Sequence, residues 1–202
     1  MGRRHDAAAP ALQIYPADEH REPHFREQRF ALVGFEPLDG DRARIEGGGT
    51  DVAILGIGKE VEELIAELQK TRKNVWWIKE MAPHDELTAL LTNAELFLCS
   101  SIYEPLGIVN LEAMGCETAV LASRVGGIPE VVADNETGRL VNYDAGNATK
   151  FESDFTNQIE ELMAKPELLT QMGKAGRVRA EKHFGWDAVA KQTIELYKSL
   201  LK

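Results

Sequence analysis

Residues 96–114 read LFLCSSIYEPLGIVNLEAM, and this stretch decides the fold of the chain. Its first four residues are apolar without alternation, which is typical of a strand buried on both faces of a parallel sheet. A loop containing Pro105 and Gly107 follows, and a helix is expected from about Gly107 to Met114. The stretch therefore predicts a strand, a polar loop and a helix in succession.

Short apolar runs alternate with amphipathic segments over most of the remaining chain. Further strands are expected at 30–33, 52–55, 75–78, 119–122 and 140–141, with Trp76 and Trp77 in the core. Helices are expected between them, because leucine and isoleucine recur at helical spacing. Four or five such units in series predict an α/β protein with a doubly wound, Rossmann-like parallel sheet.

Residues beyond 148 predict a helical C-terminal extension. Thr149 and Glu152 have the spacing of a capping box, so they indicate where one helix begins. A final helix is expected from Trp186, with Ala190, Ile194, Tyr197 and Leu201 on one face. The segment before residue 51 differs from all of this, since its prolines and charges follow no period. We therefore divide the chain into an irregular segment, 1–50, of unclear origin, and an α/β domain, 51–202.

Composition excludes several classes of function. The formal net charge of −10 would repel nucleic acids and anionic membranes. No apolar run approaches the roughly 20 residues that span a bilayer, and no secretory signal begins the chain. Cys99 and Cys116 lie in apolar stretches without neighbouring histidines, which indicates buried thiols in a reducing compartment and no metal site. A cytoplasmic protein is expected.

The loop after Cys99 carries the chemistry that the sequence predicts. In open α/β sheets ligands bind beyond the carboxyl ends of the strands. Pro105 favours an extended Glu104, whose carboxylate would project from the rim of the sheet. The N–H groups of Gly107, Ile108 and Val109 would be unpaired at the helix N-terminus, where a diphosphate can bind.

Glu112 lies one turn into this helix and could accept hydrogen bonds from ribose hydroxyls. The spacing of eight between two glutamates is weak evidence alone, because Glu19/Glu27 and Glu152/Glu160 share it. The pair Glu104/Glu112 differs from the others in spanning a junction of strand, loop and helix, with a proline and a glycine between its members. That context supports the inference.

Residues 101–114 resemble the Glu-x7-Glu signature of retaining GT-B glycosyltransferases of family 4. Residues 125–132 (VGGIPEVV) and 136–141 (ETGRLV) resemble the segments that follow it in that family. The resemblance runs from about Glu60 to the C-terminus and is nearest in character to bacterial glycogen synthases. It implies the C-terminal, nucleotide-sugar-binding domain of such an enzyme, with ADP-glucose or UDP-glucose as donor.

The resemblance also implies roles for particular residues. Glu104 would be the catalytic residue that meets the hydroxyls of the donor sugar. The phosphate would bind at Gly107, Ile108 and Val109, and the ribose at Glu112. With less support from the motif, Glu80 and Met81 would contact the base. No metal or cofactor is implied, since helix N–H groups and basic side chains neutralise the leaving diphosphate.

Two departures from the family bear on activity. In that family, the first strand of this domain normally ends in Gly-Arg, and Lys-Gly follows. Here Phe35 and Asp39 occupy the positions of that arginine and that lysine. Each missing charge-assisted contact would forfeit about 1.5–3 kcal/mol. The N-terminal domain that holds the α-glucan acceptor is also missing from these 202 residues. The final helix resembles the one that packs on that domain.

Three interpretations remain open at this point. The chain is a donor-binding glycosyltransferase domain, a non-catalytic binding or regulatory module of the same fold, or a truncated gene product. The abrupt change near residue 50 motivates the third.

Overall fold

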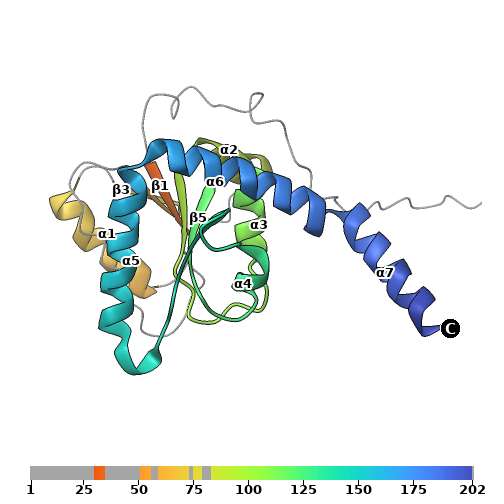
Figure 1. Cartoon of the computed structure of the whole chain (residues 1–202). Helices are drawn as coiled ribbons and strands as arrows, with labels where there is room; N and C mark the ends of the chain where they lie inside the picture. Colours follow the sequence, from red (N-terminus) through yellow and green to blue (C-terminus); the bar gives the residue numbers. More distant parts are fainter. Residues whose placement is uncertain (1–29, 35–50, 56–58, 73–74, 79–82, 202) are drawn as a thin grey trace, which may run out of the picture.

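The computed structural model describes residues 30–34, 51–55, 59–72, 75–78 and 83–201. These residues form a sheet of six parallel strands in the order β3-β2-β1-β4-β5-β6 (Figure 1). The strands are β1 (Phe30–Gly34), β2 (Asp51–Leu55), β3 (Val75–Ile78), β4 (Leu96–Cys99), β5 (Ala119–Ser123) and β6 (Gly138–Val141). This order is that of the doubly wound Rossmann fold, so the predicted fold class is confirmed.

The strand order reverses between β1 and β4. These strands pair in parallel, with Ala31 opposite Leu96 and Gly34 opposite Cys99. A crevice opens at such a reversal, because the connections from the two strands leave toward opposite faces of the sheet. The loop that follows β4 therefore begins at the usual ligand-binding position of the fold. Since β1 is central to the sheet, the sheet includes part of the segment 1–50; the division at residue 50 stays a prediction.

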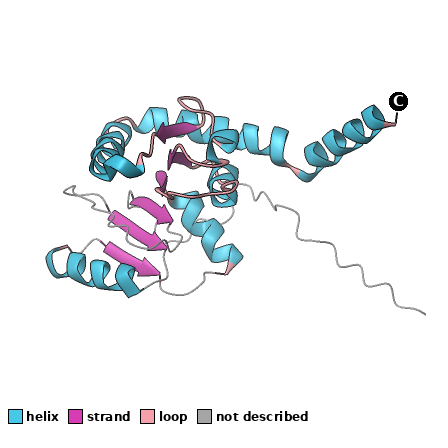
Figure 2. Cartoon of the chain, turned by 90° about the horizontal axis from the view of Figure 1, so that it is seen from below, coloured by secondary structure: helices cyan, strands magenta, loops and turns pink. Residues whose placement is uncertain are grey.

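Helices cover both faces of the sheet (Figure 2). One core contains apolar residues of α1 (Lys59–Thr71), α5 (Ala148–Met163) and α6 (Pro166–Arg179). The other contains residues of α2 (His84–Asn93), α3 (Ile108–Gly115) and α4 (Ile128–Val131). Strand β4 contributes to both, Leu96 and Leu98 to the first and Phe97 and Cys99 to the second. Burial on both faces explains why its sequence shows no alternation.

Helix α6 lies close to the start of β5. A Cβ on Gly173 would lie 1.9 Å from the carbonyl oxygen of Glu117, so the helix backbone and this turn touch directly. The helix continues through the π-helical turn Ala180–Phe184 into α7 (Trp186–Leu200), which projects from the body of the domain (Figure 1). No residue of α7 is buried, and its apolar side chains, including Trp186, Ile194 and Tyr197, are exposed.

Two local expectations were wrong. The cap of α5 is Asn147, whose side chain accepts a hydrogen bond from the N–H of Lys150, and Thr149 lies inside the helix. Asparagine is at least as favourable as threonine at the N-cap position, so the capping-box spacing alone predicted the wrong N-cap residue. Trp76 is 42% exposed instead of buried. The reason is that β3 lies at the edge of the sheet.

Within the described ranges, no helix is long and apolar enough to cross a lipid bilayer.

Candidate functional site

Glu104 lies in the loop between β4 and α3, and its carboxylate turns back into that loop. The side chain is only 8% exposed. Its Oε1 accepts hydrogen bonds from the N–H of Gly107 at 2.9 Å and from that of Leu106 at 3.2 Å. The expectation that this carboxylate projects from the rim was therefore wrong in this conformation, because two backbone donors draw it inward.

Gly107 is the N-cap residue of helix α3 and has a φ of 92°, in the left-handed region that favours glycine. Its N–H donates to Glu104, so it is not free, contrary to the prediction. The N–H groups of Ile108 and Val109 have no hydrogen-bond partner among the described residues. Ile108 is exposed and Val109 is half-buried. Two open donors at the positive end of a helix can hold an anion such as a phosphate.

A second loop, after β5, packs directly on the first. The N–H of Gly127 donates to the carbonyl oxygen of Glu104 at 3.0 Å. A Cβ on Gly126, where φ is +50°, would lie 1.9 Å from that same oxygen. The Ser123 hydroxyl donates to the carbonyl of Ser101, which adds a third contact between the loops. The glycine pair of the VGGIPE segment thus allows the backbone of Glu104 to be held in place.

Glu112 lies on α3, one turn or more beyond the loop. It is half-buried, and this burial raises the pKa of its carboxyl, while the charge of His84 partly opposes the rise. His84 is the first residue of α2, so the pair joins the two neighbouring helices. His84 is exposed, and no feature of the sequence links residues 84 and 112.

Two arginines of α6 bind the carboxyl ends of the helices that follow β4 and β5. Arg177 donates to the carbonyl of Gly115 at 3.0 Å, at the end of α3. Arg179 donates to the carbonyls of Val131 and Glu130, both at 2.8 Å, at the end of α4. Cations are favourable at helix C-termini, where carbonyls are otherwise unpaired. The sequence offered no signal for these contacts, which join residues about 50 to 60 positions apart.

The predicted donor-binding residues thus form one group around the start of α3. Glu104, Gly107, Ile108 and Val109 lie together in the loop and first turn, and Glu112 follows on the same helix. Glu80 and Met81, predicted to contact the base, lie outside the described residues, as do Phe35 and Asp39. In the described part of the chain, no group of three or more His, Cys, Asp or Glu side chains could hold a metal ion.

Known families and proteins resemble this chain in sequence. Residues 43–179 match the family described as glycosyl transferases group 1. The chain is 46% identical over 144 residues to alpha-maltose-1-phosphate synthase of Mycolicibacterium smegmatis, covering 71% of this chain and 37% of that protein. It is 29% identical over 158 residues to glycogen synthase of Mycobacterium tuberculosis, covering 77% and 36%.

Among solved structures, the chain is similar to the C-terminal domain of the glycosyl transferase group 1 family protein LpcC from Francisella tularensis. The TM-score is 0.66 at 17% identity, over 87% of this chain and 98% of that domain, which shows a shared fold. The chain spans less than half the length of the two curated relatives. On the family match and the 46% identity, the chain belongs to the group 1 glycosyl transferases, and its described part has the fold of their C-terminal domain.

Proposed function

We propose that this chain is the nucleotide-sugar-binding domain of a retaining glycosyltransferase, with ADP-glucose or UDP-glucose as donor. The observation that carries the proposal is the start of α3, where the N–H groups of Ile108 and Val109 are open beside Glu104 at the strand-order reversal. An anionic diphosphate fits such a helix terminus without a metal ion. Glu112 then lies one turn further along, within reach of the ribose.

The role proposed for Glu104 is contact with the hydroxyls of the donor sugar. In the described conformation its carboxylate accepts from Gly107 and Leu106. Release from the Gly107 N–H would supply both a third helix donor for the phosphate and a free carboxylate for the sugar. The backbone of Glu104 need not move, because Gly127 holds its carbonyl. Glu80 and Met81 remain the proposed contacts of the base.

The acceptor has two candidates. The greater identity to alpha-maltose-1-phosphate synthase than to glycogen synthase favours a small phosphorylated acceptor over a glucan. Transfer of one glucosyl unit from ADP-glucose or UDP-glucose to a hydroxyl of α-glucose 1-phosphate would form maltose 1-phosphate and release ADP or UDP. An α-glucan acceptor, as in glycogen synthesis, is the second candidate. In both cases we propose that the acceptor is held by a further N-terminal domain, which the exposed apolar face of α7 would contact.

We also propose a cytoplasmic location, consistent with the free thiols of Cys99 and Cys116.

Calorimetric titration of the 202-residue chain with ADP-glucose, UDP-glucose and ADP tests donor binding. We expect weak but saturable binding of at least one nucleotide, with further loss in Glu112→Ala. Glu160→Ala is a matched control, since Glu160 is an exposed glutamate on α5. No binding of any nucleotide would contradict the proposal.

Assays with radiolabelled donor and either α-glucose 1-phosphate or glycogen test transfer. We expect none from the chain alone, because the acceptor site is proposed to lie elsewhere. A second assay joins this chain to the N-terminal part of a full-length relative. If that fusion binds nucleotide but transfers no sugar, the result favours the non-catalytic module instead.

A further inference from the structure

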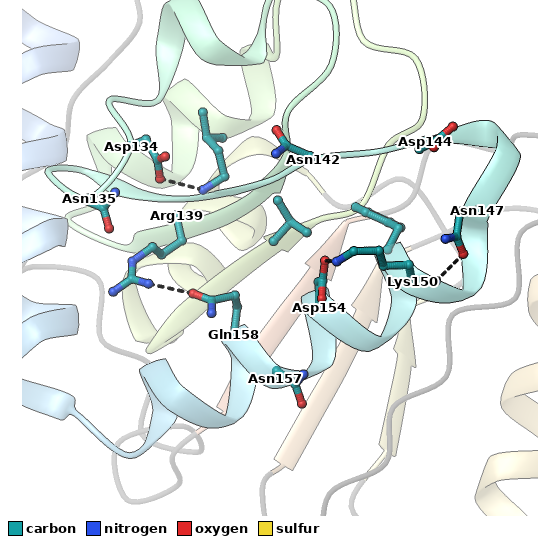
Figure 3. Close-up of a pocket in the computed structure, with 13 residues that line it drawn as sticks. Asp134, Asn135, Arg139, Asn142, Asp144, Asn147, Lys150, Asp154, Asn157 and Gln158 are labelled. Atoms are coloured by element: carbon teal, nitrogen blue, oxygen red, sulfur yellow. Dashed lines mark hydrogen bonds and ion pairs between the residues drawn. The ribbon is translucent and has the colours of Figure 1, made fainter.

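A pocket lies on the opposite side of β5 from the proposed donor site. It has a volume of about 540 Å³ and is lined by residues of the β6 region and of α5 (Figure 3). This size is within the range of small-molecule sites. Strand β6 lies at the opposite edge of the sheet from β3, and β5 separates it from β4. The pocket therefore shares no residue with the loop 100–107 or with α3.

One wall comes from a polar stripe on α5. Lys150, Asp154, Asn157 and Gln158 recur at helical spacing and line the pocket together. The stripe lies beside the apolar one formed by Phe151 and Phe155, which packs into the core. Polar and apolar stripes thus divide the surface of the helix.

The two cations of the pocket and two of its three carboxylates have charged partners, and the third, Asp144, accepts from the Gly146 N–H. Lys150 pairs with Asp154, and Asp134 pairs with Arg124. Arg139 donates to the Gln158 amide oxygen at 2.8 Å and lies 3.6 Å from Glu161. Both lining cations therefore already have a partner, although the buried Nε–H of Arg139 has none among the described residues. The acidic groups likewise form no set that could hold a metal ion within the described residues.

Neutral amides are the groups left open. The side chains of Asn135, Asn142 and Asn157 line the pocket and have no hydrogen-bond partner among the described residues. Each amide offers an acceptor oxygen and two N–H donors. A sugar hydroxyl also donates and accepts hydrogen bonds. Two neighbouring hydroxyls can therefore donate to the oxygen of one amide and accept from its N–H group. In Figure 3, Asn135 and Asn142 lie beside β6 and Asn157 lies on α5, so the amides come from both segments that line the pocket.

We propose that this pocket binds a short stretch of neutral oligosaccharide, as a carbohydrate-binding site separate from the donor crevice. Open amides around a cavity whose two cations already have partners favour a neutral polyhydroxyl ligand over an anion, and no set of acidic groups there could hold a metal ion within the described residues. This site is additional to the proposed function. Only the choice of an α-linked glucan as one of the probes rests on the proposed function.

The test uses the ¹⁵N-labelled full chain and NMR titration with maltoheptaose, cellohexaose and ADP. We expect at least one of the two sugars to shift the side-chain amide signals of Asn142 and Asn157, and the responding sugar identifies the linkage. Asn142→Ala and Asn157→Ala should each weaken that binding about three- to tenfold, as expected for one neutral hydrogen bond. Gln171→Ala, which removes an exposed amide from α6 outside the pocket, should bind as the unaltered chain does.

Three results would overturn the proposal: no shift with either sugar, shifts confined to residues 104–112, or unchanged affinity in both asparagine variants. Thermal unfolding checks that each variant is folded, and the two variants alter different walls. The ADP arm separates the two hypotheses. Sugar binding without ADP binding contradicts only the proposed function, and ADP binding without sugar binding contradicts only this inference.

Discussion

The carboxylate of Glu104 lies 2.9 Å from the N–H of Gly107 and thereby caps the helix whose N-terminus forms the candidate phosphate site. The residue proposed to meet the donor sugar is thus also the residue that orders the loop around it. Structure and proposed function depend on the same side chain, which makes its variants informative.

Glu104→Gln and Glu104→Ala should differ in stability. Glutamine keeps an oxygen that accepts from Leu106 and Gly107, so we expect a loss of about 1 kcal/mol, the difference between charged and neutral acceptors. Alanine leaves the buried Gly107 donor without an acceptor, and the loss should rise to about 2–3 kcal/mol. Urea unfolding measures both, with Glu160→Ala as an exposed control. Equal losses in the two variants would contradict the hydrogen bonds described.

Gly126→Ala should disrupt the contact between the two loops. The new Cβ would lie 1.9 Å from the Glu104 carbonyl oxygen, and φ is +50°. We expect a loss of about 2–4 kcal/mol in the free energy of unfolding, with loss of nucleotide binding. Gly115→Ala is the control, because an added Cβ there meets no atom within 4 Å. If the Gly126 variant is as stable as that control, the loops do not pack as described.

Arg179→Ala should destabilise the end of α4. It removes two hydrogen bonds to the carbonyls of Glu130 and Val131. It also removes the cation–π contact in which the guanidinium carbon lies 5.9 Å from the centre of the Phe184 ring. We expect a loss of about 2–4 kcal/mol by urea unfolding. Arg179→Lys should be less destabilised than Arg179→Ala, because lysine keeps the positive charge but lacks the planar guanidinium group. Lys174→Ala, at an exposed position of α6, should change little.

Glu112→Gln should alter how stability depends on pH. Burial raises the pKa of the Glu112 carboxyl, so the folded protein binds this proton more tightly than the unfolded chain does. The stability from this group is present below the unfolded pKa, near 4.5, and is lost as the pH rises through the folded pKa.

We therefore expect Glu112→Gln to be more stable than the unaltered chain at neutral pH, by less than about 1 kcal/mol because the group is half-exposed. The gain should vanish near pH 4, and nucleotide binding should weaken. Unfolding curves from pH 4 to 7 measure the difference, with Glu160→Gln as control. A variant that is less stable at pH 7 would contradict the sign of the pKa shift.

Sequence alone predicted much of the fold. The apolar runs of residues 52–55, 75–78, 96–99 and 119–122 are strands. Strands β4 and β5 are buried on both faces, which leaves an uninterrupted apolar signal in the sequence. The helix after Gly107 was predicted from Pro105 and Gly107, which act through local backbone geometry. The Glu-x7-Glu spacing in that context indicated the family, which the comparisons confirmed.

Tertiary structure decided what depends on neighbours distant in the sequence. The inward turn of Glu104, the Gly127 contact on its carbonyl, and the arginines of α6 at the ends of α3 and α4 join segments that no periodicity links. The central place of β1 and the amide-lined pocket beside β6 likewise follow from strand order, which sequence patterns leave open. Local signals determine which segments are strands and helices; the geometry of each site depends on which of them come to lie side by side.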